Sequence, residues 1–166
     1  GEPQGERELR EAICSYLGRH RGVVCTPEHI VVGAGVQSLL HILCPMVRDR
    51  KNAYFYNPGF RQGRTIFEDF EFRTGGMRSA REAGGPDSGS ICYLTPSQMT
   101  VWGEVMHITE RMDLLKEAFE KDILIIEDDY NSEFRYYNRP TPSLQGLAGG
   151  RGVVYLGTFS RLLLPS

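Results

Sequence analysis

Short apolar runs that stop at turns of glycine, proline or polar residues constrain the fold of this chain most. They are residues 30–32, 53–56, 91–94, 123–126 and 153–156, and helical periodicity fills much of the sequence between them. Apolar runs of this length are typical of strands buried on both faces, and alternation of strands with helices is typical of a parallel sheet. The sequence therefore predicts an α/β fold: a mostly parallel sheet with helices on both faces.

Apolar residues at helical spacing predict the helices that join these strands. Leu9, Ile13 and Leu17 recur among charged residues over 6–19, and Gly22 is expected to end that helix. Further helices are expected over 39–47, 60–67 and 108–120. A weak strand is expected at 68–73, followed by a surface loop over 75–89 because glycines crowd that stretch.

Charge and composition exclude several classes of function. The 166 residues carry 19 Lys and Arg against 21 Asp and Glu, a formal charge of −2, so no cationic surplus supports binding to nucleic acid. No apolar run approaches the roughly 20 residues of a membrane-spanning helix, and the polar N-terminus does not resemble a signal peptide. The four cysteines form no Cys-x-x-Cys pair, so no metal site is expected. We expect one cytoplasmic domain with no membrane or nucleic-acid partner.

The glycine turn at 33–35 is the first candidate binding element. Small residues before a helix expose backbone N–H groups that can hold a phosphate. A dinucleotide fingerprint is only partly matched, because Ser38 stands where the last glycine or alanine is required. An ordinary strand-to-helix turn is the alternative to a phosphate site.

The acidic cluster of Glu127, Asp128 and Asp129 is the second candidate. It follows the clearest buried strand, and ligands of parallel sheets bind beyond the carboxyl ends of strands. Its carboxylates could bind Mg²⁺, as in phosphoryl transfer, or one could pair with a cationic ring nitrogen beside Tyr130, or they could serve only as helix caps and loop residues. Because side chains alternate along extended chain, Asp128 and Tyr130 are expected on one face and Asp129 on the other.

Several stretches carry a family resemblance in the right order. They are GEPQGERELREAICSYLGRHRGVVCTPEHIVVGAGVQSLL, YNPGF, YLTPSQ, ILIIEDDYNSEFRYY and VVYLGTFSRLLLPS. With them the chain resembles the large domain of fold-type I pyridoxal 5'-phosphate (PLP) enzymes, and most closely the aminotransferase-like domain of MocR-type transcriptional regulators of the GntR superfamily. The resemblance implies that 1–166 is a partial PLP-binding large domain, incomplete at both ends, without the DNA-binding winged helix and the C-terminal small domain.

The resemblance also implies a cofactor, partners and site residues. PLP would be the cofactor, an amino acid or amine the small-molecule partner, and the full-length protein a homodimer. Phe60 would stack on the cofactor ring, Asp128 would pair with the pyridinium nitrogen and Tyr130 would hydrogen-bond the phenolic oxygen. The implied ligands of the cofactor phosphate lie in two turns: Gly35, Val36, Gln37, Thr158 and Ser160.

Arg161 departs from the family pattern at the catalytic position. Family members carry there the lysine whose amine forms a Schiff base with the cofactor aldehyde, and a guanidinium stays protonated and cannot replace that amine. In addition, residues 98–103 read QMTVWG where the family has a His-Gln-aromatic-Pro-Thr-Gly run. Two functions stay open: a PLP-dependent aminotransferase-type domain, catalytic or ligand-sensing, and a non-catalytic remnant that binds a phosphorylated ligand or a partner.

The family pattern also implies a missing strand. The segment after position 161 normally returns through the sheet between the strand near Ile30 and the strand near Ile91. Buried backbone groups left unpaired cost about 1–3 kcal/mol each. We therefore expect a chain of these 166 residues to aggregate, to dimerise through that edge, or to be part of a longer protein.

Overall fold

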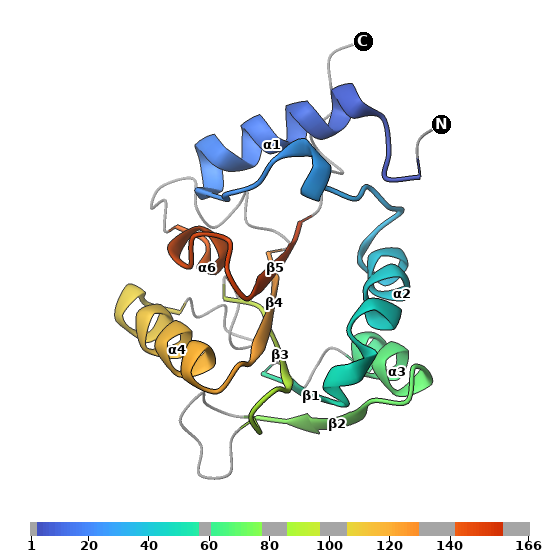
Figure 1. Ribbon diagram of the computed structural model, residues 1–166, viewed down its shortest axis with the longest axis vertical. Helices are drawn as coiled ribbons and strands as arrows, with labels where there is room; N and C mark the ends of the chain where they lie inside the picture. The colour runs from blue at the N-terminus through green and yellow to red at the C-terminus, as the bar shows by residue number, and fades with distance from the viewer. Residues whose placement is uncertain (1–2, 57–60, 78–85, 97–105, 130–141, 158–166) are drawn as a thin grey trace.

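A parallel sheet forms the centre of the computed structural model, which describes residues 3–56, 61–77, 86–96, 106–129 and 142–157 (Figure 1). Its strand order is β2-β1-β3-β4-β5, and every neighbouring pair is parallel. The strands are β1 (Asn52–Phe55), β2 (Arg73–Gly76), β3 (Ile91–Leu94), β4 (Leu124–Asp128) and β5 (Val153–Leu156). The predicted α/β class is thereby confirmed.

Helices cover both faces of the sheet, as Figure 1 shows. One face packs against α2 and α3, and the other against α4 and α6, while α1 lies across the end of the sheet near β5. The helices are α1 (Arg7–Arg21), α2 (Val36–Met46), α3 (Arg61–Asp69), α4 (Ile108–Glu120) and α6 (Leu144–Leu147), with 3-10 turns η1 (Pro27–His29) and η2 (Arg48–Arg50). Among the described residues, no helix combines the length and the apolarity needed to cross a bilayer.

Alternating side chains of the central strands fill two separate cores. Tyr93 and Ile126 pack with Phe67 of α3 on the first face, whereas Cys92 and Ile125 pack with α4 and α6 on the second. All of Ile91–Leu94 is buried because helices cover both faces. This burial explains why the strands read as apolar runs and not as an alternating pattern.

Several predicted boundaries are confirmed by the structure. The strands at 91–94 and 153–156 and the helix at 108–120 have the expected limits. Gly22 ends α1 in the left-handed conformation, with φ 64°, and its N–H donates to the Leu17 carbonyl. Such a conformation suits glycine at a helix C-terminus.

The run at 30–32, for which the sequence predicts a strand or an extended segment, is an extended segment outside the described sheet. Ile30 is extended, with φ −106° and ψ 131°, but the described sheet contains only β1 to β5. The N–H of Val32 donates instead to the Gln4 carbonyl at 2.8 Å. An extended segment becomes a strand only when a partner lies beside it, which the local sequence does not reveal.

The gap expected beside the strand of Ile91 is not found in the described sheet. The strand of Ile91 is central, because β3 pairs with β1 on one side and with β4 on the other. Within the described sheet, the edges are β2 and β5. The weak strand expected at 68–73 lies further along the chain, as β2, because α3 continues to Asp69 and Glu71 turns the chain with φ 69°.

Candidate functional site

The first turn of α2 lies at the edge of the sheet where the strands end. Because α2 leads through η2 directly into the start of β1, α2 runs opposite to the strands and begins at their carboxyl ends. This is the edge at which parallel sheets bind ligands. The glycine turn and the end of β4 therefore share one edge of the molecule.

Gly35 shapes the turn before α2. Its φ of 98° lies in the left-handed region, and a Cβ placed there would meet open space, so the conformation and not crowding requires glycine. Val36 and Gln37 are the first two residues of α2, and no side chain at the N-cap accepts a hydrogen bond from the N–H groups of the first turn. Such N–H groups and the helix dipole favour an anion. The Gln37 side chain donates to Gln62 Oε1 at 2.6 Å and ties α2 to α3.

Asp128, at the end of β4, points to the same face of the sheet as α2 and α3. Its side chain is 3% exposed, and the Tyr93 hydroxyl donates to its Oδ2 at 2.5 Å. Tyr93 belongs to the core that α2 and α3 cover. The buried Asp128 carboxylate thus lies on the face of the sheet that α2 covers. The N-terminal N–H groups of α2 lie at the same edge of the sheet as this carboxylate.

Asp129 points to the opposite face, as the alternation of extended chain predicts. Arg21 Nε donates to its Oδ2 at 2.7 Å, and the Tyr155 hydroxyl donates to the same oxygen. Burial raises the pKa of Asp129, and the Arg21 charge opposes that rise. Asp129 therefore joins α1 to the sheet and is directed away from Asp128.

Glu127 serves as an acceptor for the start of α6. Its two oxygens accept the N–H groups of Leu144 at 2.8 Å and Gln145 at 3.0 Å. Burial, with the nearby Asp129 charge as the second cause, raises the pKa of Glu127 to about 7. Glu127 and Asp128 face opposite sides of the sheet, which disfavours a Mg²⁺ site between their carboxylates. The described residues hold no group of three potential metal ligands.

The remaining predicted site residues lie outside the described part of the chain. These are Phe60, Tyr130, Thr158, Ser160 and Arg161. Of the predicted set, the structure places Gly35, Val36, Gln37 and Asp128 at one edge of the sheet. Their proposed contacts with a ligand stay predictions.

The residues that hold the acidic cluster in place were not predicted from the sequence. Tyr93 has a signal in retrospect, because it is the one side chain with a hydroxyl in the apolar run 91–94. Arg21 and Tyr155 have none, because nothing local links them to Asp129, which is 108 positions from Arg21. Both reach it only through the packing of α1 and β5.

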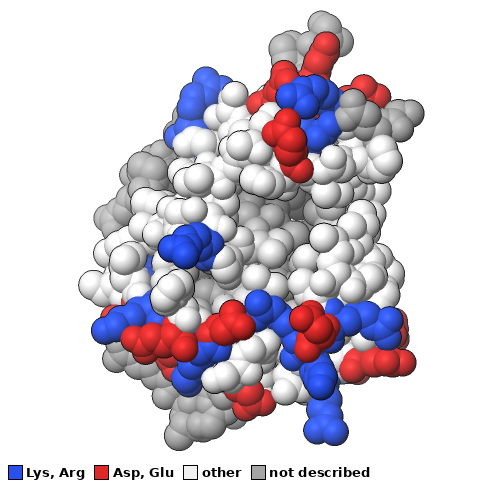
Figure 2. All heavy atoms as spheres, viewed as in Figure 1, with Lys and Arg blue, Asp and Glu red and all other residues white. Residues whose placement is uncertain are grey.

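A hollow adjoins this edge. A cavity of about 360 Å³ lies between α1, the start of α2 and β5, and Leu17, Leu39, Tyr155 and Gly157 are among the residues that line it. On the face shown in Figure 2, charged side chains gather over α1 and along the opposite edge, while the hollowed middle is largely uncharged.

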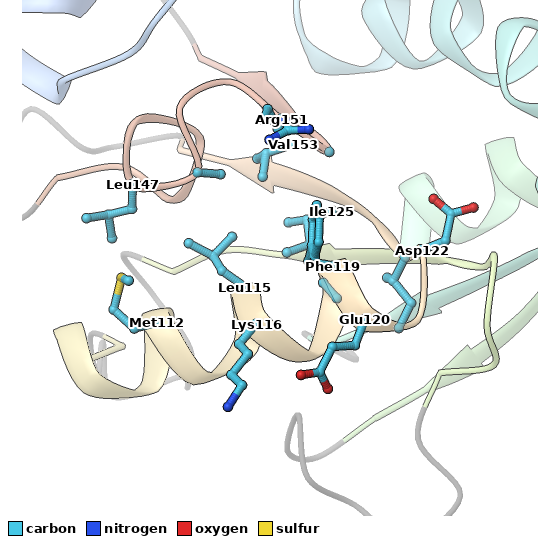
Figure 3. A pocket seen from close by; sticks show the side chains of 14 residues that line it. Met112, Leu115, Lys116, Phe119, Glu120, Asp122, Ile125, Leu147, Arg151 and Val153 are labelled. Carbon is cyan, nitrogen blue, oxygen red and sulfur yellow. The ribbon is translucent and has the colours of Figure 1, made fainter.

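A larger cavity, of about 540 Å³, lies near the amino ends of β4 and β5 and so away from the glycine turn. Figure 3 shows Leu115 of α4 and Leu147 of α6 pointing toward each other across it, while Lys116 and Glu120 point away. Its lining is mainly apolar side chains without a convergent set of polar groups. This cavity is not the candidate site.

Comparisons with known proteins find relatives among transcriptional regulators. The HTH-type transcriptional regulator YhdI of Bacillus subtilis is 43% identical over 171 residues, covering 100% of this chain and 36% of the regulator. The probable rhizopine catabolism regulatory protein MocR of Rhizobium meliloti is 33% identical, covering 98% of this chain and 34% of its own length. The chain thus spans about a third of these curated relatives.

Solved structures give the same fold. An archaeal alanine:glyoxylate aminotransferase superposes with a TM-score of 0.82 at 25% identity, over 98% of this chain and 44% of that enzyme. No protein-family model matches the chain. The matches cover the chain from end to end and a minor part of each relative.

Proposed function

The chain belongs to the aminotransferase-like domains of MocR-type regulators, which have the fold of PLP-dependent aminotransferases, and from this premise we propose that it binds PLP without a covalent bond and senses an amino acid or amine. In the proposal the full-length protein is a cytoplasmic homodimer, as the resemblance implies. The chain would contribute the cofactor pocket and not the reaction, because Arg161 occupies the position of the Schiff-base lysine.

The observation that carries the proposal is the shared edge of the α2 N-terminus and the Asp128 carboxylate. The N–H groups of Val36 and Gln37 suit a phosphate dianion, and a buried carboxylate suits a protonated ring nitrogen. PLP carries both groups on one molecule and, when bound, supplies an electron sink for carbanions. The residues described at this edge therefore fit the phosphate and the ring nitrogen of PLP.

The lysines support non-covalent binding. The chain has three, Lys51, Lys116 and Lys121. Lys51 directly precedes β1, Lys121 lies at the end of α4 just before β4, and Lys116 lines the cavity at the amino ends of the strands. All three thus lie toward the edge of the sheet opposite to the glycine turn.

A second function has a specific observation in its favour. The loss of the lysine at position 161 is typical of a non-catalytic remnant, and the N–H groups at the start of α2 would hold any phosphorylated ligand. In this case Asp128 would have no role in binding. The two functions are therefore separated by the contribution of Asp128 to affinity.

Titration of the full-length protein with PLP, followed by borohydride reduction and mass spectrometry, tests the proposal. We expect saturable binding and no pyridoxyl adduct on any lysine. Asp128→Asn should weaken PLP binding about tenfold or more, since a hydrogen bond to a charged group is lost. Asp87→Asn, which changes a carboxylate bonded to Tyr54 at the other edge of the sheet, is the matched control.

Three other results of the PLP titration and the borohydride reduction would count against the proposal. A stable adduct on one of the three lysines would contradict non-covalent binding. Unchanged PLP affinity in Asp128→Asn, together with equal affinity for a phosphorylated compound that lacks the pyridine ring, would favour the remnant. No binding of PLP at all would overturn the proposed function.

A further inference from the structure

We propose that Tyr93 is a positioning residue for the cofactor: its hydroxyl holds the Asp128 carboxylate in the orientation that the PLP ring nitrogen requires. The inference rests on the proposed function, because it assigns Tyr93 a role through Asp128. Neither the glycine turn nor the acidic cluster contains Tyr93, which comes from the middle of β3.

The hydrogen bond between the two side chains is short and buried. The Tyr93 hydroxyl lies 2.5 Å from Asp128 Oδ2, at the short end of the range for a hydroxyl donating to a carboxylate. Tyr93 is 0% exposed and Asp128 is 3% exposed. Water therefore has little access to compete for the bond.

The sheet register brings the two residues together. Tyr93 lies opposite Ile126 in the β3–β4 pair, so Asp128 is two residues further along β4 and on the same face. A tyrosine reaches such a diagonal neighbour. The next residue, Asp129, is on the other face and accepts from Arg21 and Tyr155.

Aromatic packing fixes the direction of the Tyr93 hydroxyl. The Tyr93 ring stacks on Phe55, with centroids 5.2 Å apart and an interplanar angle of 27°. Phe67 meets it edge-on at 6.4 Å and 81°. All three rings belong to the core under α2 and α3, so packing restricts the position of the Tyr93 hydroxyl.

The Tyr93 hydroxyl, as a fixed donor, selects one orientation of the Asp128 carboxylate. The terminal torsion of aspartate is broad, so covalent geometry alone does not select one orientation of the carboxylate. Because the Tyr93 hydroxyl is neutral, it can orient the Asp128 carboxylate without cancelling its negative charge. Pairing with a protonated ring nitrogen requires that charge. Arg21 binds Asp129 with a full positive charge, and the two neighbouring carboxylates thus have donors of different kinds.

The test compares two ligands in two proteins. Full-length protein and its Tyr93→Phe variant are titrated with PLP and with 1-deaza-PLP, in which a C–H group replaces the ring nitrogen. We expect Tyr93→Phe to weaken PLP binding about tenfold and to leave affinity for the deaza compound unchanged. A purely structural role would weaken both ligands equally, and that result would overturn the inference, as would unchanged affinity for PLP.

A matched control and a second variant complete the test. Tyr54→Phe removes another tyrosine–aspartate hydrogen bond, the one to Asp87 at 3.1 Å, and should leave the binding of both ligands unchanged. If Tyr93→Phe is too unstable to purify, Tyr93→Phe/Asp128→Asn is compared with Asp128→Asn alone. Equal PLP affinities are expected, because Tyr93 acts only through the carboxylate; a further loss would overturn the inference.

The outcomes distinguish this inference from the proposed function. If the unsubstituted protein binds no PLP, the proposed function fails and the role of Tyr93 fails with it. If it binds PLP and Asp128→Asn weakens binding but Tyr93→Phe does not, the proposed function stands and only the inference is wrong.

Discussion

Arg21 Nε lies 2.7 Å from Asp129 Oδ2, so the last turn of the first helix is bonded to the end of a central strand 108 residues later. The side chains are 4% and 0% exposed. A buried pair of this kind contributes modestly when intact, but removing one partner leaves an uncompensated buried charge. The pair therefore makes the position of α1 depend on the acidic cluster.

Arg21→Met should reduce the free energy of unfolding by about 3–5 kcal/mol, because the Asp129 carboxylate stays buried without its cation. Urea unfolding measures the change. Arg7→Met on the same helix is the control, because the ion pairs of Arg7 with Glu11 and Glu28 are exposed to solvent and should contribute little to stability. Equal effects of the two substitutions would contradict the prediction.

Glu127 should make the protein less stable as the pH rises from 5 to 7. Its pKa is raised to about 7 in the folded state, above its ordinary value of 4.5, so between these values the folded state binds more protons than the unfolded state. Stability contributed by this group is then present below the ordinary pKa and falls by about 2 kcal/mol from pH 5 to pH 7.

Glu127→Gln isolates this effect. The substitution also disturbs the hydrogen bonds to the N–H groups of Leu144 and Gln145, but that cost does not vary with pH. Unfolding free energies measured by urea at pH 5 and pH 7 should therefore show a smaller fall in the variant than in the unsubstituted protein. An identical pH dependence in both would show that Glu127 does not titrate in this range.

Gly146→Ala should destabilise the contact between α6 and the end of α1. A Cβ at Gly146 would lie 2.2 Å from the Gly22 carbonyl oxygen, and backbone cannot move aside as a side chain can. We expect a loss of about 1–3 kcal/mol in a urea or thermal melt. Gly76→Ala is the control, because a Cβ there meets nothing within 4 Å; a comparable loss in that variant would point to a general cost of replacing glycine.

Cys14 and Cys25 should form a disulfide under a thiol oxidant such as diamide. Their sulfurs are 3.4 Å apart, and a bond requires an approach to about 2.05 Å. Burial raises the pKa of Cys25 to about 11, so the reaction should be slow at pH 7 and faster at pH 9. Peptide mapping without reductant should find this pair and leave the buried Cys44 and Cys92 free. Linkage of Cys44 or Cys92 instead would contradict the prediction.

Arg161→Lys should restore a covalent bond to PLP if the rest of the pocket is intact. The substitution replaces a guanidinium by an amine that can condense with the cofactor aldehyde. Borohydride reduction and peptide mass spectrometry should then locate a pyridoxyl group at position 161. Arg151→Lys places an amine at the amino end of β5 as a control and should give no adduct. Absence of an adduct at position 161 would place the defect elsewhere in the pocket.

The local sequence pattern predicts the bounds of a helix or strand where burial or helical periodicity alone determines them. The runs 91–94 and 153–156 and the helix 108–120 have their predicted bounds because each carries its own apolar signal. The short α6 was not predicted, since its four residues carry no periodicity and Ser143 and Glu127 provide acceptors for its first N–H groups. The run 30–32, expected as a strand or an extended segment, is extended at Ile30 but lies outside the described sheet, because strand pairing depends on a neighbour that the local sequence does not show.

Patterns within short segments were enough to predict the fold class, the edge of the sheet at which the candidate site lies, and the opposite directions of Asp128 and Asp129. The partner of each carboxylate depends on how the chain packs: Tyr93 of β3 bonds to Asp128, and Arg21 of α1 bonds to Asp129. These partners lie far from the carboxylates along the chain. Partners 35 and 108 positions away meet through sheet register and helix packing, and no local pattern records that encounter.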